Sequence, residues 1–147
     1  MNAYERNVVD EALGIVRHNF RKGRVLGSPE DTRDLLRIKL AEVKNEVFGV
    51  LFLSNRHAVL ADEILFYGTI DGCSVHPRVV VQKALEVNAA ACILYHQHPS
   101  GVAEPSQSDI RITQRIRDTL ALIEVRVLDH FIVSVEESVS LAEKGII

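Results

Sequence analysis

Two short, continuous apolar segments constrain the fold of this 147-residue chain more than any other feature. Residues 46–53 read Glu-Val-Phe-Gly-Val-Leu-Phe-Leu, and residues 89–95 read Ala-Ala-Ala-Cys-Ile-Leu-Tyr. Apolar runs of this length without polar alternation are typical of strands that are covered on both faces. We therefore predict two central strands in a sheet that carries helices on both sides.

Four segments space their apolar residues as helices do when one face packs on a core. The first lies near the N-terminus. The second begins at Ser28, a favourable N-cap that Pro29 follows at the first helical position, and runs to about Val43. The third covers Pro77 to Asn88, and the fourth begins after Ser106. The predicted inner faces are, in chain order, Val9, Ala12, Leu13, Val16 and Phe20; Leu35, Leu36, Leu40 and Val43; Val80, Ala84 and Val87; and Ile112, Ile116, Leu120 and Ile123.

Further strands are predicted between and after these helices. A turn over residues 54–57 leads into a partner strand at Ala58–Ala61, and another strand at Ile64–Ile70 ends in an Asp-Gly turn. A strand that starts at Val125 runs on to Val135. Because strands alternate with helices after a helical start, we predict an α/β protein with a mixed central sheet sandwiched by helices.

Charge argues against a general nucleic-acid-binding surface. The net charge is −3 and the isoelectric point is about 6.1, whereas affinity for phosphates needs clustered Lys and Arg. One local basic cluster, formed by Arg17, Arg21, Lys22 and Arg24, leaves a nucleic-acid contact open as an alternative to a solvated helix end.

The two cysteines are too few for a disulfide scaffold or a cysteine-rich metal site. Cys92 lies in the second apolar run and is predicted to be a small core residue. The N-terminus does not have the pattern of a signal peptide, and no apolar run approaches the roughly 20 residues that span a bilayer. We expect a cytoplasmic protein without a membrane segment.

The chemically most specific pattern is His-x-His-x7-Ser-x2-Asp, formed by His96, His98, Ser106 and Asp109. Residues two apart on an extended segment face the same side, with Cα atoms about 6.5 Å apart, so two imidazoles can converge on one ion while Gln97 points away. Asp109 lies in the first turn of the helix capped by Ser106, where the helix dipole favours a carboxylate. The loop between the two halves contains prolines and a glycine that can turn the chain back.

Each half of this pattern also has a purely structural interpretation. His-x-His pairs are common on surfaces and in packed cores, and Ser106 with Asp109 fits a capping box. The junction of the two halves at the carboxyl end of a predicted central strand favours a metal site, because ligands bind at such ends in α/β sheets.

Two imidazoles and one carboxylate leave the fourth position of a tetrahedral zinc site open, which is typical of catalytic zinc. Such a site needs a base for the attacking water and a donor for the developing oxyanion. Ser106 is the candidate donor and Glu46 a candidate base. Glu42, Glu63 and Glu104 are rivals to Glu46, and spacing does not choose among them.

The pattern resembles the JAMM (MPN+) metalloenzyme signature and, more narrowly, is similar to bacterial RadC-like proteins. The resemblance covers about residues 25–147 and rests on several segments in the family's order, namely residues 75–78, 84–91, 96–101, 105–109 and 128–130. It implies a three-layer α/β/α sandwich of the cytidine-deaminase-like (JAB/MPN) type over residues 25–147, preceded by an N-terminal helix within residues 1–24.

The resemblance also implies roles for individual residues. One zinc ion per chain would be held by His96, His98 and Asp109, with Glu46 as the catalytic base and Ser106 as the oxyanion donor. The wider JAMM group cleaves peptide or isopeptide bonds, so a peptide or protein substrate is implied. RadC-like proteins also carry a DNA-repair label, which leaves a DNA- or protein-binding role as the alternative function.

Two positions depart from the family pattern. RadC-like proteins usually have Asn, and JAMM proteases Ser or Thr, where Gln97 stands between the two histidines. Val79 stands where the family commonly has Glu. Neither position is a metal ligand in the family pattern, but both can alter what lines the cleft.

The remaining histidines carry weaker predictions. Asp129 and His130 are candidates for supporting contacts behind the metal ligands. His76 precedes a helix and is predicted either to line the cleft or to cap and pack there. His18 and His57 are predicted to be solvated.

Overall fold

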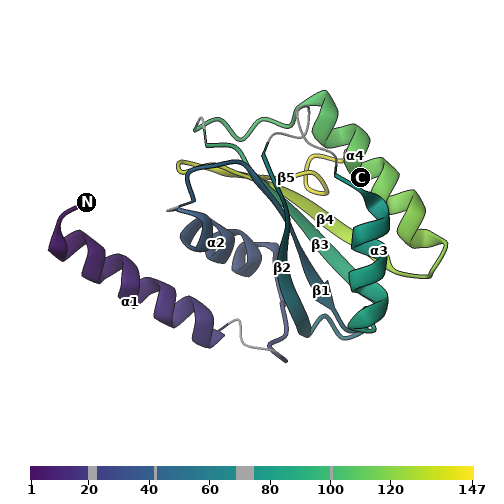
Figure 1. Ribbon diagram of the computed structural model, residues 1–147, viewed down its shortest axis with the longest axis horizontal. Coiled ribbons are helices and arrows are strands. Elements are labelled where there is room, and N and C mark those ends of the chain that lie inside the picture. Colours follow the sequence, from purple (N-terminus) through teal and green to yellow (C-terminus); the bar gives the residue numbers. More distant parts are fainter. Residues whose placement is uncertain (20–22, 42, 69–74, 100) are drawn as a thin grey trace.

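A five-stranded mixed sheet in the order β2-β1-β3-β4-β5 forms the centre of the computed structural model (Figure 1). β1 is antiparallel to both β2 and β3, β3 is parallel to β4, and β5 is antiparallel to β4. The structure describes residues 1–19, 23–41, 43–68, 75–99 and 101–147. The elements are α1 (Ala3–Asn19), α2 (Pro29–Leu40), β1 (Val47–Leu53), β2 (Val59–Tyr67), α3 (Pro77–Glu86), β3 (Ala91–Gln97), α4 (Gln107–Ala121), β4 (Arg126–Val133) and β5 (Ser138–Ser140).

Helices cover both faces of the sheet, which confirms the predicted three-layer α/β/α sandwich. Leu36 and Leu40 of α2 pack on one face, and Val80 of α3 with Ile116 and Leu120 of α4 packs on the other. α1 lies outside this sandwich and contacts α2 (Figure 1). Among the described residues, none of the helices is both long and apolar enough to cross a membrane.

The two apolar runs form the predicted central strands. All seven residues of β1 and all seven of β3 are buried, because both strands have neighbours on each side and helices above and below. The predicted helix starts are also correct: Ser28 caps α2 by accepting a hydrogen bond from the Asp31 amide at 3.3 Å. α2 ends at Leu40, short of the predicted Val43.

The prediction of separate strands at Ala58–Ala61 and Ile64–Ile70 is wrong, because one strand, β2, runs through both as far as Tyr67. The polar pair Asp62 and Glu63 lies between the two predicted segments. In an extended strand these neighbours face opposite sides of the sheet, so one continuous strand accommodates both.

Each of these carboxylates has a lysine partner on its own face of the sheet. Asp62 forms an ion pair with Lys39 of α2, and Glu63 forms one with Lys83 of α3 at 3.0 Å. The short edge strand β5 was not predicted. It pairs with the end of β4. Its sequence, Ser-Val-Ser, is too short and too polar to predict a strand by itself.

Some predictions fall outside the described residues. They concern Phe20, the side chain of Leu35, Arg21 and Lys22 of the basic cluster, Glu42, Cys73 and the turn at residues 71–72. Cys92 is described, and it is fully buried as predicted. Burial raises the pKa of its thiol to about 12, so Cys92 is an inert core residue.

The antiparallel register of β1 and β3 explains how residues far apart in the sequence meet. Phe48 of β1 pairs with His96 of β3. The N-terminal end of β1 therefore lies beside the C-terminal end of β3, and Glu46, which directly precedes β1, is brought to the histidines.

Candidate metal centre

The end of β3 separates its side chains between the two faces of the sheet. His96 and His98 face the α4 side, whereas the Gln97 side chain faces the α2 side and donates a hydrogen bond to the carbonyl of Val43. The His98 amide continues the sheet by donating to the carbonyl of Val133 at 2.8 Å. The predicted alternation along an extended segment is therefore present.

Asp109 is held in place by the start of α4. The Ser106 amide donates to Asp109 Oδ2 at 2.8 Å, and the Asp109 amide donates to Ser106 Oγ at 3.0 Å, so both bonds of a capping box are formed. The Asp109 side chain has no exposed surface. The structural interpretation of this pair is thus correct, and the same bonds aim the carboxylate at the histidines.

Asp109 contacts both histidines. Its Oδ1 lies 2.7 Å from His96 Nδ1, and its Oδ2 lies 3.2 Å from His98 Nε2. One ligand atom from each residue lies within 4.8 Å of the other two. In a tetrahedral zinc site with bonds of about 2.0 to 2.1 Å, neighbouring ligand atoms are about 3.3 Å apart. The three side chains therefore fit a single metal ion, and together they could hold one.

The electrostatics of this group favour a positive charge at its centre. Burial by itself raises the pKa of Asp109, but hydrogen bonds from His96, His98 and the Ser106 amide outweigh burial and hold that pKa well below its usual range. The hydrogen bond to Asp109 raises the pKa of His98 above its usual 6.5. A buried carboxylate that draws a proton onto its neighbour is also suited to a divalent cation.

Glu46 is the acidic residue that the fold brings to this group. Its Oε2 lies 3.1 Å from His96 Nε2, and its side chain keeps 26% of its surface exposed. Glu63 is instead paired with Lys83 of α3 at the edge strand β2, and Glu104 is exposed in the loop before α4. Among the described rivals, Glu46 is thus the one in contact with the group, at the ring nitrogen of His96 opposite the one that meets Asp109.

Ser106 is exposed at the N-terminus of α4, next to the carboxylate that it caps. Its hydroxyl oxygen accepts the bond from the Asp109 amide. That bond does not use the hydroxyl proton, which can be donated toward the open side of the site.

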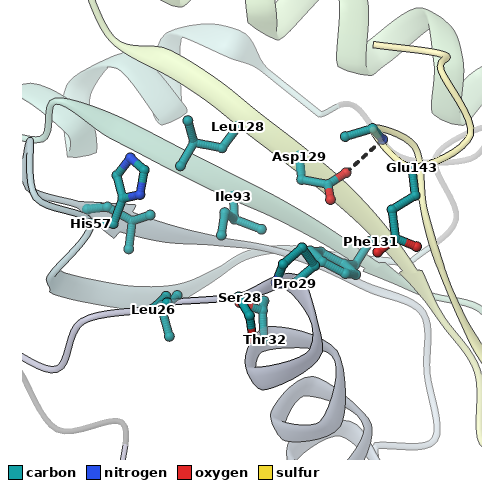
Figure 2. A pocket seen from close by; sticks show the side chains of 13 residues that line it. Leu26, Ser28, Pro29, Thr32, His57, Ile93, Leu128, Asp129, Phe131 and Glu143 are labelled. Atoms are coloured by element: carbon teal, nitrogen blue, oxygen red, sulfur yellow. Dashed lines mark hydrogen bonds between the residues drawn. The ribbon is translucent and has the colours of Figure 1, made fainter.

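Asp129 lies apart from the group formed by His96, His98 and Asp109. It lies on the α2 side of the sheet, at a cavity of about 280 Å³, where Figure 2 shows it beside Leu128. Its Oδ1 accepts from the amides of His130 at 2.7 Å and Ala142 at 3.0 Å, and its Oδ2 accepts from the Ser140 hydroxyl. Asp129 therefore fastens the C-terminal segment to β4.

The other histidines lie away from the ligands. His76 is the N-cap residue of α3, is exposed, makes no side-chain capping bond, and has its ring 6.3 Å from that of Phe66. His18 is exposed, as predicted. His57 is partly exposed and lines the cavity of Figure 2.

His130 lies on the same side of the sheet as His96 and is fully buried. Its ring packs edge-on against Phe48, with 5.6 Å between ring centres. Its Nδ1 lies 2.5 Å from Thr113 Oγ1, and the Thr113 hydroxyl donates to the carbonyl of Asp109 at 2.5 Å. Thr113 was not predicted, although its position one helical turn after Asp109 was a usable signal.

The burial of His130 predicts a pH-dependent loss of stability. Burial lowers its pKa to about 3, with Asp109 favouring the proton and His96 and His98 opposing it. Between pH 6.5 and about 3 the unfolded chain therefore binds more protons at this residue than the folded chain does, so stability falls as pH falls, by up to about 1.4 kcal/mol per pH unit.

Urea unfolding of the wild type and of His130→Leu between pH 7 and pH 4.5 measures this effect. Other groups titrate in both proteins, so the difference in unfolding free energy isolates His130. We expect the unfolding free energy of the variant, relative to that of the wild type, to increase steadily as the pH falls below 6.5. A constant difference across this range would show that His130 titrates normally.

The sequence of this chain is similar to those of known proteins. The sequence model of the RadC-like JAB domain matches residues 26–146. A UPF0758 protein of Stutzerimonas stutzeri is 59% identical over 126 residues, covering 86% of this chain and 56% of that protein. A UPF0758 protein of Thioalkalivibrio sulfidiphilus is 59% identical over 129 residues, covering 88% of this chain and 57% of the relative. The chain thus spans little more than half the length of these two curated relatives.

The match to a further relative extends into α1. A UPF0758 protein of Vibrio cholerae serotype O1 is 50% identical over 143 residues, covering 97% of this chain and 90% of that protein. The similarity to this protein therefore extends beyond the matched domain into the N-terminal helix.

Proposed function

The chain belongs to the RadC-like JAB domain family, and on this premise we propose that it is a zinc-dependent hydrolase that cleaves amide bonds in peptides or proteins. The observation that carries the proposal is the contact between Glu46 and His96, because it places a partly exposed carboxylate beside three residues that fit one metal ion. A structural zinc site would be closed by a fourth protein ligand, whereas a catalytic site keeps one position open.

The roles of the residues follow from their positions. His96, His98 and Asp109 would hold the ion. When bound, a zinc ion would polarise the scissile carbonyl and lower the pKa of a water at the open position to about 7. Glu46 takes a proton from the attacking water and gives one to the leaving amine. Ser106 donates its hydroxyl proton as a hydrogen bond to the developing oxyanion.

The net charge of −3 favours a peptide or isopeptide substrate over a nucleic acid. The test is hydrolysis of fluorogenic peptides and of lysine-linked isopeptides by the zinc-loaded protein, with Glu46→Gln as the diagnostic variant. Glu104→Gln is a matched control, because Glu104 is exposed and lies outside the site.

We expect Glu46→Gln to lose between about 10²- and 10⁴-fold in turnover while it still binds zinc, since proton transfer is removed and the ligands remain. The Glu104→Gln control should retain wild-type turnover. The proposal fails if the zinc-loaded wild type hydrolyses none of these substrates, or if Glu46→Gln turns them over as fast as the wild type.

A further inference from the structure

A buried chain of hydrogen bonds runs from β4 to the helix turn that carries Asp109. Thr113 has a single hydroxyl proton, which it donates to the Asp109 carbonyl, so the short contact to His130 Nδ1 requires the imidazole to donate. The bonds therefore run in one direction, from His130 Nδ1–H to Thr113 and from Thr113 to Asp109. One tautomer of His130 is selected, with its proton on Nδ1.

We propose that Thr113 and His130 are positioning residues that fix the first turn of α4 against β4 and thereby aim the Asp109 carboxylate at the metal. This inference rests on the metal site of the proposed function. The capping box orders Asp109 relative to its own helix, but it leaves the distance between α4 and the sheet unset. Apolar residues such as Ile116 and Leu120 pack the later turns of α4 on the sheet, and the bond from His130 fixes its first turn, which carries Asp109, relative to His96 and His98.

The second ring nitrogen of His130 supports a role beyond stability. Nε2 is buried and has no hydrogen-bond partner among the residues that the structure describes. A buried polar atom without a partner costs free energy, which a leucine of similar size at this place would avoid. A histidine here is thus unfavourable for stability, whereas its Nδ1 bond to Thr113 serves the ligand geometry.

The test measures metal binding and stability separately. Zinc affinity is obtained by competition with a chromophoric chelator, and the cobalt(II)-substituted protein reports ligand geometry in its visible absorption spectrum. The main variant is Thr113→Val with His130→Leu, which removes both ends of the bond and leaves neither donor unpaired. Thr113→Ser keeps the hydroxyl, and Thr119→Val is the matched control, because Thr119 makes the same bond to the carbonyl four residues earlier, in the last turns of α4.

We expect the double variant to bind zinc about 10- to 100-fold more weakly, the range typical when a partner behind a metal ligand is lost. Its cobalt spectrum should change, while its metal-free unfolding midpoint should not fall below that of the wild type. Thr113→Ser should bind zinc within about threefold of the wild type, and Thr119→Val should bind as the wild type does.

Three outcomes would overturn the inference. The double variant could bind zinc as tightly as the wild type, or Thr113→Ser could be as weak as the double variant. Thr119→Val could also weaken zinc binding equally, which would point to general loosening of α4. If the wild type itself binds no zinc, the proposed function fails instead, so the two failures are distinguishable.

Discussion

Asp109→Asn is expected to remove metal binding and, with it, the stabilisation that a metal gives to the fold. Asp109 is the one carboxylate among the three candidate ligands, it contacts both histidines, and it has no exposed surface. Asn keeps the shape but supplies no charge to offset that of a divalent cation. We therefore expect zinc affinity to fall by more than about 100-fold, beyond the effect of losing a supporting contact.

Thermal unfolding with and without zinc provides the measurement. A ligand at about 1,000 times its dissociation constant stabilises the folded state by about 4 kcal/mol, so the wild type should show a clear rise in midpoint and Asp109→Asn should show none. Asp118→Asn, an exposed aspartate on the same helix, is the control and should respond to zinc as the wild type does. An equal zinc-dependent shift in Asp109→Asn would remove Asp109 from the ligand set.

The central strands of the fold could be predicted because a strand that is buried on both faces has a continuous apolar sequence. β1 has no polar residues and β3 has them only at its carboxyl end, so their runs could be identified without knowing their neighbours. β2 is an edge strand, and the polar pair Asp62 and Glu63 divides its apolar residues into two short runs. The ion pairs with Lys39 and Lys83 on two different helices, together with the hydrogen bond from the Tyr95 hydroxyl to Asp62, explain why that pair is tolerated.

The same distinction holds for the site. The His-x-His strand end and the capped helix start are each short local segments. Strand alternation therefore suffices to predict where the side chains of His96 and His98 point, and helix capping suffices for Asp109. Glu46 could be chosen among four glutamates only through the resemblance, because its place depends on the register of β1 with β3. The face on which Asp129 lies depends on a register irregularity between β3 and β4, which no local pattern reveals.

Gly49→Ala is expected to destabilise the protein by about 3 kcal/mol or more, at the upper end of what overpacking costs in a core. Gly49 pairs with Tyr95 across β1 and β3. A Cβ at Gly49 would lie 2.1 Å from Tyr95 Cζ and 2.3 Å from its hydroxyl oxygen. The ring has no space to retreat, because it is fully buried and its hydroxyl donates to Asp62 at 2.8 Å. Glycine is therefore required here by the close approach of an aromatic ring.

Urea unfolding of Gly49→Ala, Tyr95→Leu and the double variant tests this explanation. Leucine lacks the ring atoms that the new methyl group would meet, so the double variant should be clearly more stable than the two single losses together imply, with a coupling of about 1 to 3 kcal/mol. Gly14→Ala is the control, since nothing lies within 4 Å of its new Cβ in α1, and it should gain about 0.5 to 1 kcal/mol. Strictly additive losses would mean that Tyr95 is not what excludes a side chain at Gly49.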